Sequence, residues 1–265
     1  MHIIVMHERV DVIAAALEAG IPADGPRDED NRTLLMIACR YDFEMVDLLL
    51  RWGADVNHSV YIRHPPRDNI IRGDTFETPL IEAVDGDAEV VRLLLEANAE
   101  ISVQVPEGAD WGGQNAPFTK AMYALNAPVV SLLIDAGADI TQHVCNRPPL
   151  FWAVESSLKW PDDEAKDAHA IAEKLLQAHT ARGTLNEALE ERFELHRRNE
   201  SQEYSGTVLH HCAKKGSAEM YKLLRSLDAP LWRNREGRFP LHLARDAGMA
   251  QCIIETSPCT IATTP

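Results

Sequence analysis

A short helix-opening motif recurs six times along this chain of 265 residues. Each copy has a bulky apolar third residue and ends on alanine or cysteine, and the copies occupy residues 33–38, 78–83, 116–121, 148–153, 207–212 and 239–244. Their first positions are 45, 38, 32, 59 and 32 residues apart, which describes a unit of 32 to 33 residues with insertions after the first, second and fourth copies. Such a period predicts a stack of small units whose core grows with each repeat.

The residues of each copy predict a short helix followed by a second one. Thr33, Thr78 and Thr207 can cap the free amides of a helix start, and Pro79, Pro117, Pro149 and Pro240 occupy the first helical position, where a missing N–H costs nothing. Apolar residues then recur at helical spacing, which predicts a buried stripe on the second helix. The residue after each second helix is one that tolerates a left-handed backbone. These residues are Gly20, Gly53, Asn98, Gly137, His179 and Asp228.

With these motifs the chain resembles the ankyrin-repeat family. The closest matches are Gly53-Ala54-Asp55-Val56-Asn57, Gly137-Ala138-Asp139-Ile140 and Phe239-Pro240-Leu241-His242-Leu243-Ala244, and the resemblance covers roughly residues 8–256. It implies an all-α solenoid of about six to seven helix-turn-helix units joined by hairpin loops. We expect a single domain over residues 1–265, with a partial N-terminal cap at 1–28, repeats that start near 29, 74, 112, 144, 203 and 235, and a C-terminal tail at 257–265.

Three insertions depart from the family pattern. Two hairpin loops are enlarged, at residues 58–74 and 102–115, and we expect both to project from the same edge of the molecule. Twice-elaborated loops on one edge suggest a recognition surface, although tolerated insertions are an alternative because lengthening a loop costs little entropy. The fourth full repeat carries a third insertion, with residues 158–164 ahead of its second helix near 169–178. Residues 184–200 are expected to form an additional amphipathic helix.

Charge and cysteine content narrow the class of partner and the compartment. The net charge is −15, with 18 basic against 36 acidic residues over 1–203 and 8 against 5 over 204–265. An acidic surface disfavours nucleic acid and favours a basic protein segment, unless the acidity serves solubility alone. No apolar run approaches the roughly 20 residues that cross a bilayer, so no membrane partner is expected. Five cysteines without a C-x-x-C pair predict reduced, mostly buried thiols and a cytoplasmic and/or nuclear protein.

The resemblance implies that partners bind the hairpin tips and the concave face formed by the first helices. The candidate partner-binding residues are Arg32, Arg40, Tyr41, Trp52, Asp85, Trp111, Tyr123 and Trp152. Trp52 is the strongest of them, because tryptophan, tyrosine and arginine dominate interface energies and the slot just before Gly53 lies outside the buried stripe. The alternative is an aromatic side chain packed on the adjacent repeat. The resemblance also makes Asn57 a candidate for asparaginyl hydroxylation, since Leu49 and Asp55-Val56-Asn57 match the preferred context.

The sequence contains no recognisable catalytic, cofactor or metal motif. His210 and His211 point about 100° apart on a helix, so they cannot share a metal as an i, i+4 pair can. His210 and His242 instead match the structural histidine of the family motif. We therefore expect a noncatalytic, monomeric protein-binding module for a basic or amphipathic partner segment. The alternatives are an acidic chaperone or inhibitor that masks a basic protein, a piece of a self-assembling scaffold, and an enzyme with a pocket between Trp152, Glu155 and His179.

Overall fold

The computed structural model describes residues 10–62, 75–102, 117–144, 147–157, 162–191, 193–195 and 204–257. The chain divides into two compact units, unit 1 over Met1–Cys145 and unit 2 over Asn146–Pro265. Across the described residues, six helix pairs follow one partial unit, as the repeat count predicted. The expectation of one continuous domain over 1–265 stays a prediction.

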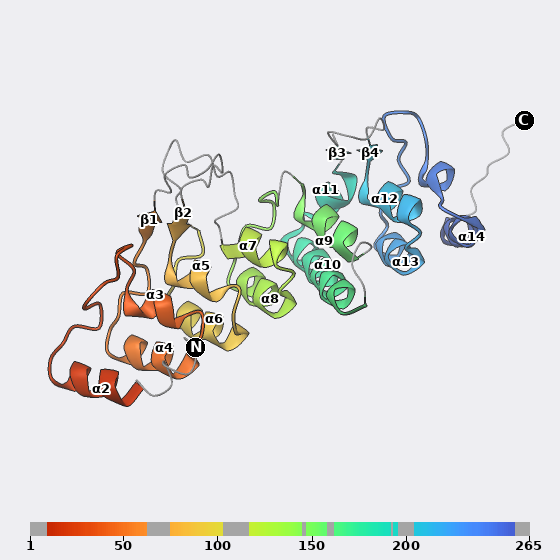
Figure 1. Ribbon diagram of the computed structural model, residues 1–265. Coiled ribbons are helices and arrows are strands. Elements are labelled where there is room, and N and C mark those ends of the chain that lie inside the picture. Colours follow the sequence, from red (N-terminus) through yellow and green to blue (C-terminus); the bar gives the residue numbers. More distant parts are fainter. Residues whose placement is uncertain are drawn as a thin grey trace, which may run out of the picture. The chain divides into compact units, whose positions relative to one another are not determined.

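Unit 1 consists of one isolated helix and three helix pairs (Figure 1). The isolated helix is α2 (Val10–Glu18), which packs on α4 and corresponds to the predicted partial first unit. The pairs are α3 (Leu34–Ala38) with α4 (Phe43–Arg51), α5 (Pro79–Ala83) with α6 (Ala88–Glu96), and α7 (Pro117–Tyr123) with α8 (Ala127–Asp135). The first helices α3, α5 and α7 form one row and the second helices α4, α6 and α8 form another.

Side-chain caps explain why the helices of unit 1 begin where they do. The Thr33 hydroxyl accepts a hydrogen bond from the Met36 amide at 3.4 Å, and that of Thr78 accepts one from the Ile81 amide at 3.2 Å. Asp42 does the same for the Met45 amide at 3.0 Å, at the start of α4. Each cap satisfies an amide that lacks a partner inside its helix.

The core of unit 1 runs along the second helices, as their apolar stripes predicted. The completely or almost completely buried stripe residues are Met45, Val46, Leu49, Val90, Val91, Leu94, Val129, Val130 and Leu133. The first helix α5 is buried along its whole length, because helices of both neighbouring repeats pack on it. The core is therefore a ribbon shared between repeats, the arrangement expected of a repeat protein.

The first enlarged loop begins and ends as a β-hairpin. Strand β1 (Val60–Ile62) pairs antiparallel with β2 (Thr75–Glu77), with Val60 opposite Glu77 and Ile62 opposite Thr75. The hairpin extends away from the second helices, on the side of α3 and α5 (Figure 1). Most of the second enlarged loop, from residue 103, lies outside the described residues, as does Trp111.

Unit 2 contains the remaining three helix pairs and one further short helix. The pairs are α9 (Pro149–Ser157) with α10 (Asp162–Arg182), α12 (Val208–Lys215) with α13 (Ala218–Ser226), and the 3-10 helix η1 (Pro240–Leu243) with α14 (Ala247–Thr256). Between the first two pairs lie α11 (Leu185–Glu190) and an antiparallel hairpin of β3 (Phe193–Leu195) and β4 (Tyr204–Gly206). Helices dominate both units, so the predicted all-α repeat fold is confirmed.

The fourth repeat differs from the prediction at two places. Helix α10 spans 21 residues and continues through His179, so the left-handed residue is Gly183, with φ +72°, and not His179. Residues 162–182 include neither glycine nor proline, and nothing stops the helix before Gly183. The additional helix predicted for 184–200 is only the six-residue α11, because residues 193–195 pair with β4 instead.

The other left-handed positions agree with the sequence. Gly20, Gly53, Asn98, Gly137 and Asp228 all have positive φ, between +59° and +97°. The structural histidine is confirmed at one of its two predicted positions. His210 is fully buried; its Nδ1 accepts the Thr207 amide at 3.2 Å, and its Nε2 lies 3.0 Å from the Arg238 carbonyl. His242 makes the equivalent bond to the Phe239 amide at 3.1 Å but is exposed, because it belongs to the last of the described repeats.

Three cysteines of the described chain are free and buried, namely Cys39, Cys212 and Cys252. Burial raises the pKa of the Cys39 and Cys212 thiols far above the ordinary value, since the thiolate is poorly solvated inside the core. The predicted reduced, buried thiols are therefore present at these three positions. Cys145 and Cys259 lie outside the described residues.

Candidate interaction surface

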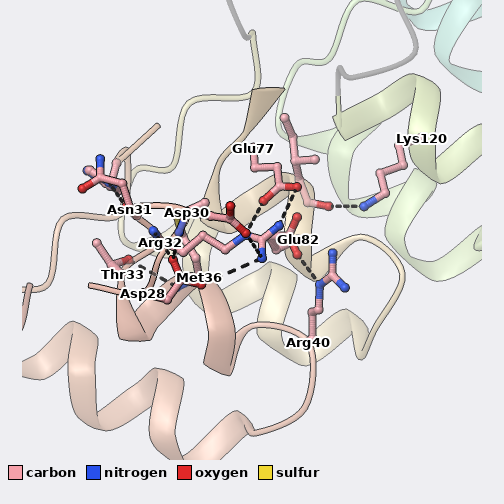
Figure 2. A network of polar contacts seen from close by, with 12 residues as sticks. Asp28, Asp30, Asn31, Arg32, Thr33, Met36, Arg40, Glu77, Glu82 and Lys120 are labelled. Atoms are coloured by element: carbon pink, nitrogen blue, oxygen red, sulfur yellow. Dashed lines mark hydrogen bonds and ion pairs between the residues drawn. The ribbon is translucent and has the colours of Figure 1, made fainter. Parts of the chain in front are cut away.

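A network of charged side chains links the three repeats of unit 1 (Figure 2). We call the surface that carries it the first-helix face; it comprises Arg32, Arg40, Tyr41, Asp85, Lys120 and Tyr123, which come from α3, α5, α7 and their flanking residues. Arg32, Arg40, Tyr41, Asp85 and Tyr123 are five of the eight residues that the sequence proposed for partner binding.

Arg32 lies just before α3 and binds a carboxylate of the next repeat. Its Nε donates to Oε2 of Glu77 at 2.7 Å and its Nη2 donates to Oε1 at 3.1 Å, the two-pronged geometry that favours arginine over lysine. The hydrogen bonds to Glu77 raise the pKa of Arg32 above its ordinary value. The Asp30 carboxylate lies 3.4 Å from Nη1 of Arg32 and contributes a second negative charge. Arg32 therefore holds the segment before α3 against β2.

Arg40, two residues beyond α3, makes the corresponding contact with Glu82 on α5. Its Nε donates to Oε2 of Glu82, and this bond raises the pKa of Arg40. The two partners differ sharply in exposure, because Glu82 is 3% exposed whereas the Arg40 side chain is 45% exposed. The cation thus shields a buried carboxylate from one side and faces solvent on the other.

Lys120 on α7 continues the network into the third repeat. Its ammonium donates to the Ile81 carbonyl at 2.8 Å and lies 3.0 Å from the carboxylate of Asp85. Asp85, a predicted binding residue, remains largely exposed despite this pair. The charged candidates therefore connect neighbouring repeats, and each of them also keeps an exposed part that a partner can contact.

Tyr41, Trp52 and Tyr123, the aromatic candidates of unit 1 that the structure describes, are exposed. Tyr41 follows α3 and Tyr123 ends α7, and more than half of each residue is accessible. Trp52 is the C-cap residue of α4 and is 47% exposed, so the neighbouring repeat leaves about half of it accessible. Because Trp52 ends a second helix, it lies outside the first-helix face, and its part in partner binding stays a prediction.

Trp152, the candidate in unit 2, is half-buried on α9. The guanidinium of Arg147 lies 5.5 Å from the centre of its ring, and Arg147 also forms an ion pair with the buried Glu155. His179 is buried on α10, where its Nδ1 lies 2.9 Å from the Thr184 hydroxyl. Glu155 and His179, the polar residues of the pocket considered for an enzyme, are thus each bound to a neighbour of their own.

Asn57, the candidate for hydroxylation, connects two successive repeat turns. Its side-chain carbonyl accepts the Glu100 amide at 2.8 Å, and its side-chain amide donates to the Asn98 carbonyl at 3.3 Å. The residue is exposed. Its side chain therefore has a structural role in the turn, and whether it is modified stays a prediction.

The sequence reasoning missed Glu77, Glu82 and Lys120, which bind the predicted residues. A signal for two of them was present in the motif itself. Its fifth position holds Glu82 in the second copy and Lys120 in the third, whereas three of the other four copies have Ile37, Trp152 and Leu243 there. A charged residue at an otherwise mainly apolar position indicates a partner of opposite charge nearby.

The acidic character of the chain belongs to unit 1. Residues 1–145 hold 24 Asp and Glu against 10 Lys and Arg, a formal charge of −14, whereas residues 146–265 hold 17 against 16. Arg32, Arg40, Arg51, Arg92 and Lys120 each form an ion pair with a carboxylate of unit 1. The surplus of negative charge is therefore not balanced by these cations and gives unit 1 a negative potential.

The described part of the chain contains neither a metal-binding cluster nor a membrane-spanning helix. Among those residues, no group of three or more His, Cys, Asp and Glu is placed to hold a metal ion. None of the helices there is both long enough and apolar enough to cross a membrane.

The chain is similar to known proteins in both sequence and fold. A family model of the ankyrin repeat matches residues 30–58, and a second one matches residues 76–104. The ankyrin repeat domain of human ASB11 has a similar structure, with a TM-score of 0.58, 19% sequence identity and 95% of each chain covered. The ankyrin repeat domain of Bcl-3, a member of the IkappaB protein family, gives a TM-score of 0.57, 19% identity and 96% coverage of each chain. No curated protein sequence matches the chain. Residues 30–58 and 76–104 are therefore ankyrin repeats, and the chain shares the fold of ankyrin repeat domains over about 95% of its length.

Proposed function

We propose that this protein is a noncatalytic binding module whose unit 1 receives a basic or amphipathic segment of a partner protein. Ankyrin repeats generally serve as protein–protein interaction modules. The observation that supports the finer proposal is the charge of −14 on residues 1–145, where the ion-paired cations leave many carboxylates in excess. A negative surface attracts a basic segment over several ångströms and favours it over an acidic competitor.

The exposed aromatic residues supply the short-range part of the interaction. Trp52, Tyr41 and Tyr123 offer large apolar surfaces with a polar edge, the residue types that most often anchor interfaces. The ion pairs and the Lys120 hydrogen bond of Figure 2 hold α3, which Tyr41 follows, and α7, which carries Tyr123, so little ordering entropy opposes association. Arg32, Arg40, Asp85 and, in unit 2, Trp152 complete the proposed contacts together with Trp111.

The test compares Trp52→Ala with Trp232→Ala in affinity purification from the native cell at low and high salt. Trp232 is a matched control, because it is 43% exposed and lies in unit 2. We expect a basic protein whose capture weakens about 30-fold or more in Trp52→Ala, the effect of losing an anchor of about 2 kcal/mol, and falls at high salt. A partner whose capture survives both changes would refute Trp52 as an anchor and the negative charge of unit 1 as the source of the attraction.

A second candidate is an acidic chaperone or inhibitor that masks a basic protein until assembly. The same surplus charge supports it, since a mask must neutralise the basic surface that it covers. The two candidates differ in what the captured protein can still do. A masked partner would fail to bind polyanions such as heparin while complexed, whereas a partner held by one segment would still bind them.

The remaining expectations are proposed on the same basis. We infer a protein of the cytoplasm or nucleus, because the buried thiols of Cys39, Cys212 and Cys252 form no disulfide and suit a reducing compartment. A monomer stays an expectation from the sequence. Hydroxylation of Asn57 is tested by mass spectrometry on protein from its native cell. A peptide that contains Asn57 without added oxygen would dismiss it.

A further inference from the structure

A pocket lies where the turn that follows α4 meets the turn that follows α6. Its volume is about 290 Å³, and its lining includes Val56, Ser59, Phe76, Leu80 and Glu100. Ligand-binding clefts usually hold about 300–1,000 Å³. This pocket is therefore at the small end of that range, where it can hold one long side chain but not a large cofactor.

The lining changes from apolar to acidic. Leu80 is almost completely buried, and Val56 and Phe76 are half-buried, so these three residues form the apolar inner part. Ser59 and Glu100 are exposed at the outer part. An occupant that matches this order has an apolar stem that ends in, or passes beside, a positive charge, which is the structure of arginine and lysine side chains.

The backbone that carries Glu100 is held in place before any ligand binds. The side-chain carbonyl of Asn57 accepts the Glu100 amide at 2.8 Å, and its side-chain amide donates to the Asn98 carbonyl at 3.3 Å. The inner part is fixed by the capping bond from the Ile81 amide to the Thr78 hydroxyl, at the start of the helix that carries Leu80. A preformed site loses less ordering entropy when it binds a ligand.

We propose that this pocket binds a single arginine or lysine side chain of the partner, with its methylene stem against Val56, Phe76 and Leu80 and its charge on the Glu100 carboxylate. This inference rests on the proposed function, because it assigns to the basic partner segment a specific contact. The pocket also sets a requirement on the partner that the overall negative charge of unit 1 does not set. Only a cation with an apolar stem at the right position of the partner segment can fill both parts of the pocket.

The experiment uses the full-length protein and three capped tripeptides in amide chemical-shift titrations by NMR. The probes are acetyl-Gly-Arg-Gly-amide, the same peptide with citrulline, which is the uncharged counterpart of arginine, and the same peptide with norleucine. We expect the arginine peptide to shift the amides of Ser59, Thr78 and Glu100 in a saturable manner at millimolar concentration. The citrulline and norleucine peptides should bind about twofold to fivefold more weakly, the effect of losing one solvent-exposed ion pair.

Two variants separate the pocket from the general charge of unit 1. Glu100→Gln should abolish the preference for arginine over citrulline, because it removes the charge but keeps the size of the side chain. Glu96→Gln, at the end of α6, removes one exposed carboxylate that does not line the pocket and should leave the preference unchanged. Equal weakening by both variants, equal binding of the three peptides, or no shift with the arginine peptide would overturn the proposal.

The titration distinguishes this inference from the proposed function itself. If a basic partner is captured through Trp52 but the arginine peptide does not bind, the pocket proposal is refuted, whereas the proposed binding function is retained. If the arginine peptide binds as expected but no basic partner is captured, the function proposed for unit 1 fails alone.

Discussion

Removing either partner of the ion pair between Arg40 and Glu82 should destabilise the protein, but by different amounts. Glu82 is 3% exposed, so Arg40→Ala leaves a buried carboxylate without its cation. Such a loss costs about 3–5 kcal/mol for a fully buried pair. Arg40 itself is 45% exposed and its side of the pair is screened by water, so we expect about 2–3 kcal/mol for Arg40→Ala. Glu82→Gln keeps a hydrogen-bond acceptor and lets Arg40 hydrate, so about 1 kcal/mol is expected.

The assay is equilibrium unfolding in urea, followed by circular dichroism on the full chain. The double variant Arg40→Ala, Glu82→Gln should lose less than the sum of the two single losses, with a coupling of about 1–2 kcal/mol. Arg51→Ala is the matched control. Its ion pair with Asp47 is exposed, with 75% of the Arg51 side chain accessible, and its loss should cost at most about 0.5 kcal/mol. A loss for Arg40→Ala no larger than that for Glu82→Gln, or no coupling, would refute the reasoning.

Three further changes test the core. Leu94→Ala removes a fully buried stripe residue and should cost about 2–5 kcal/mol in urea unfolding; an unchanged midpoint would show that the stripe is assigned to the wrong register. Tyr221→Phe should leave stability unchanged or raise it by up to about 1 kcal/mol, because the buried hydroxyl has no hydrogen-bond partner among the described residues and burial raises the pKa of Tyr221 to about 12; a clear loss would reveal a partner. Burial, and then the charge of Arg182, lower the pKa of His179, with Glu187 acting in the opposite direction. The unfolded chain therefore binds a proton near pH 6.5 that the folded chain does not, so this contribution to stability is lost as the pH falls through that value. His179→Gln should flatten the fall in the urea midpoint between pH 8 and 6, and an unchanged slope would contradict the assignment.

The helix starts could be predicted from the sequence because their determinants are local. Thr33 and Thr78 cap amides only three residues away, and Gly53 and Asn98 terminate the helices that directly precede them. The end of α10 could not be predicted in the same way. His179 has a moderate tendency to end a helix, but the stronger signal of Gly183 lies four residues later and determines where the helix stops.

The sequence allowed us to predict which candidate side chains are exposed, but not which residues form ion pairs with them. The exposure of Trp52 follows from its position outside the apolar stripe of its own helix. The partners of Arg32 and Arg40 are Glu77 and Glu82, 45 and 42 residues further along the chain. An insertion of variable length separates them, so the repeat period alone does not align them. The pocket near Glu100 has the same origin, because two turns from different repeats form it.

The three buried thiols make the two units separately observable. Alkylating reagents attack the thiolate form of cysteine. In the folded protein, burial raises the pKa of Cys39 and Cys212, so these residues do not form the thiolate while the core is closed. Cys39 lies in unit 1, whereas Cys212 and Cys252 lie in unit 2. With Cys145 and Cys259 replaced by serine, the labelling rate of each remaining cysteine would report how often its own unit opens under native conditions. The protein thus contains natural reporters of whether a partner that binds unit 1 also slows the opening of unit 2.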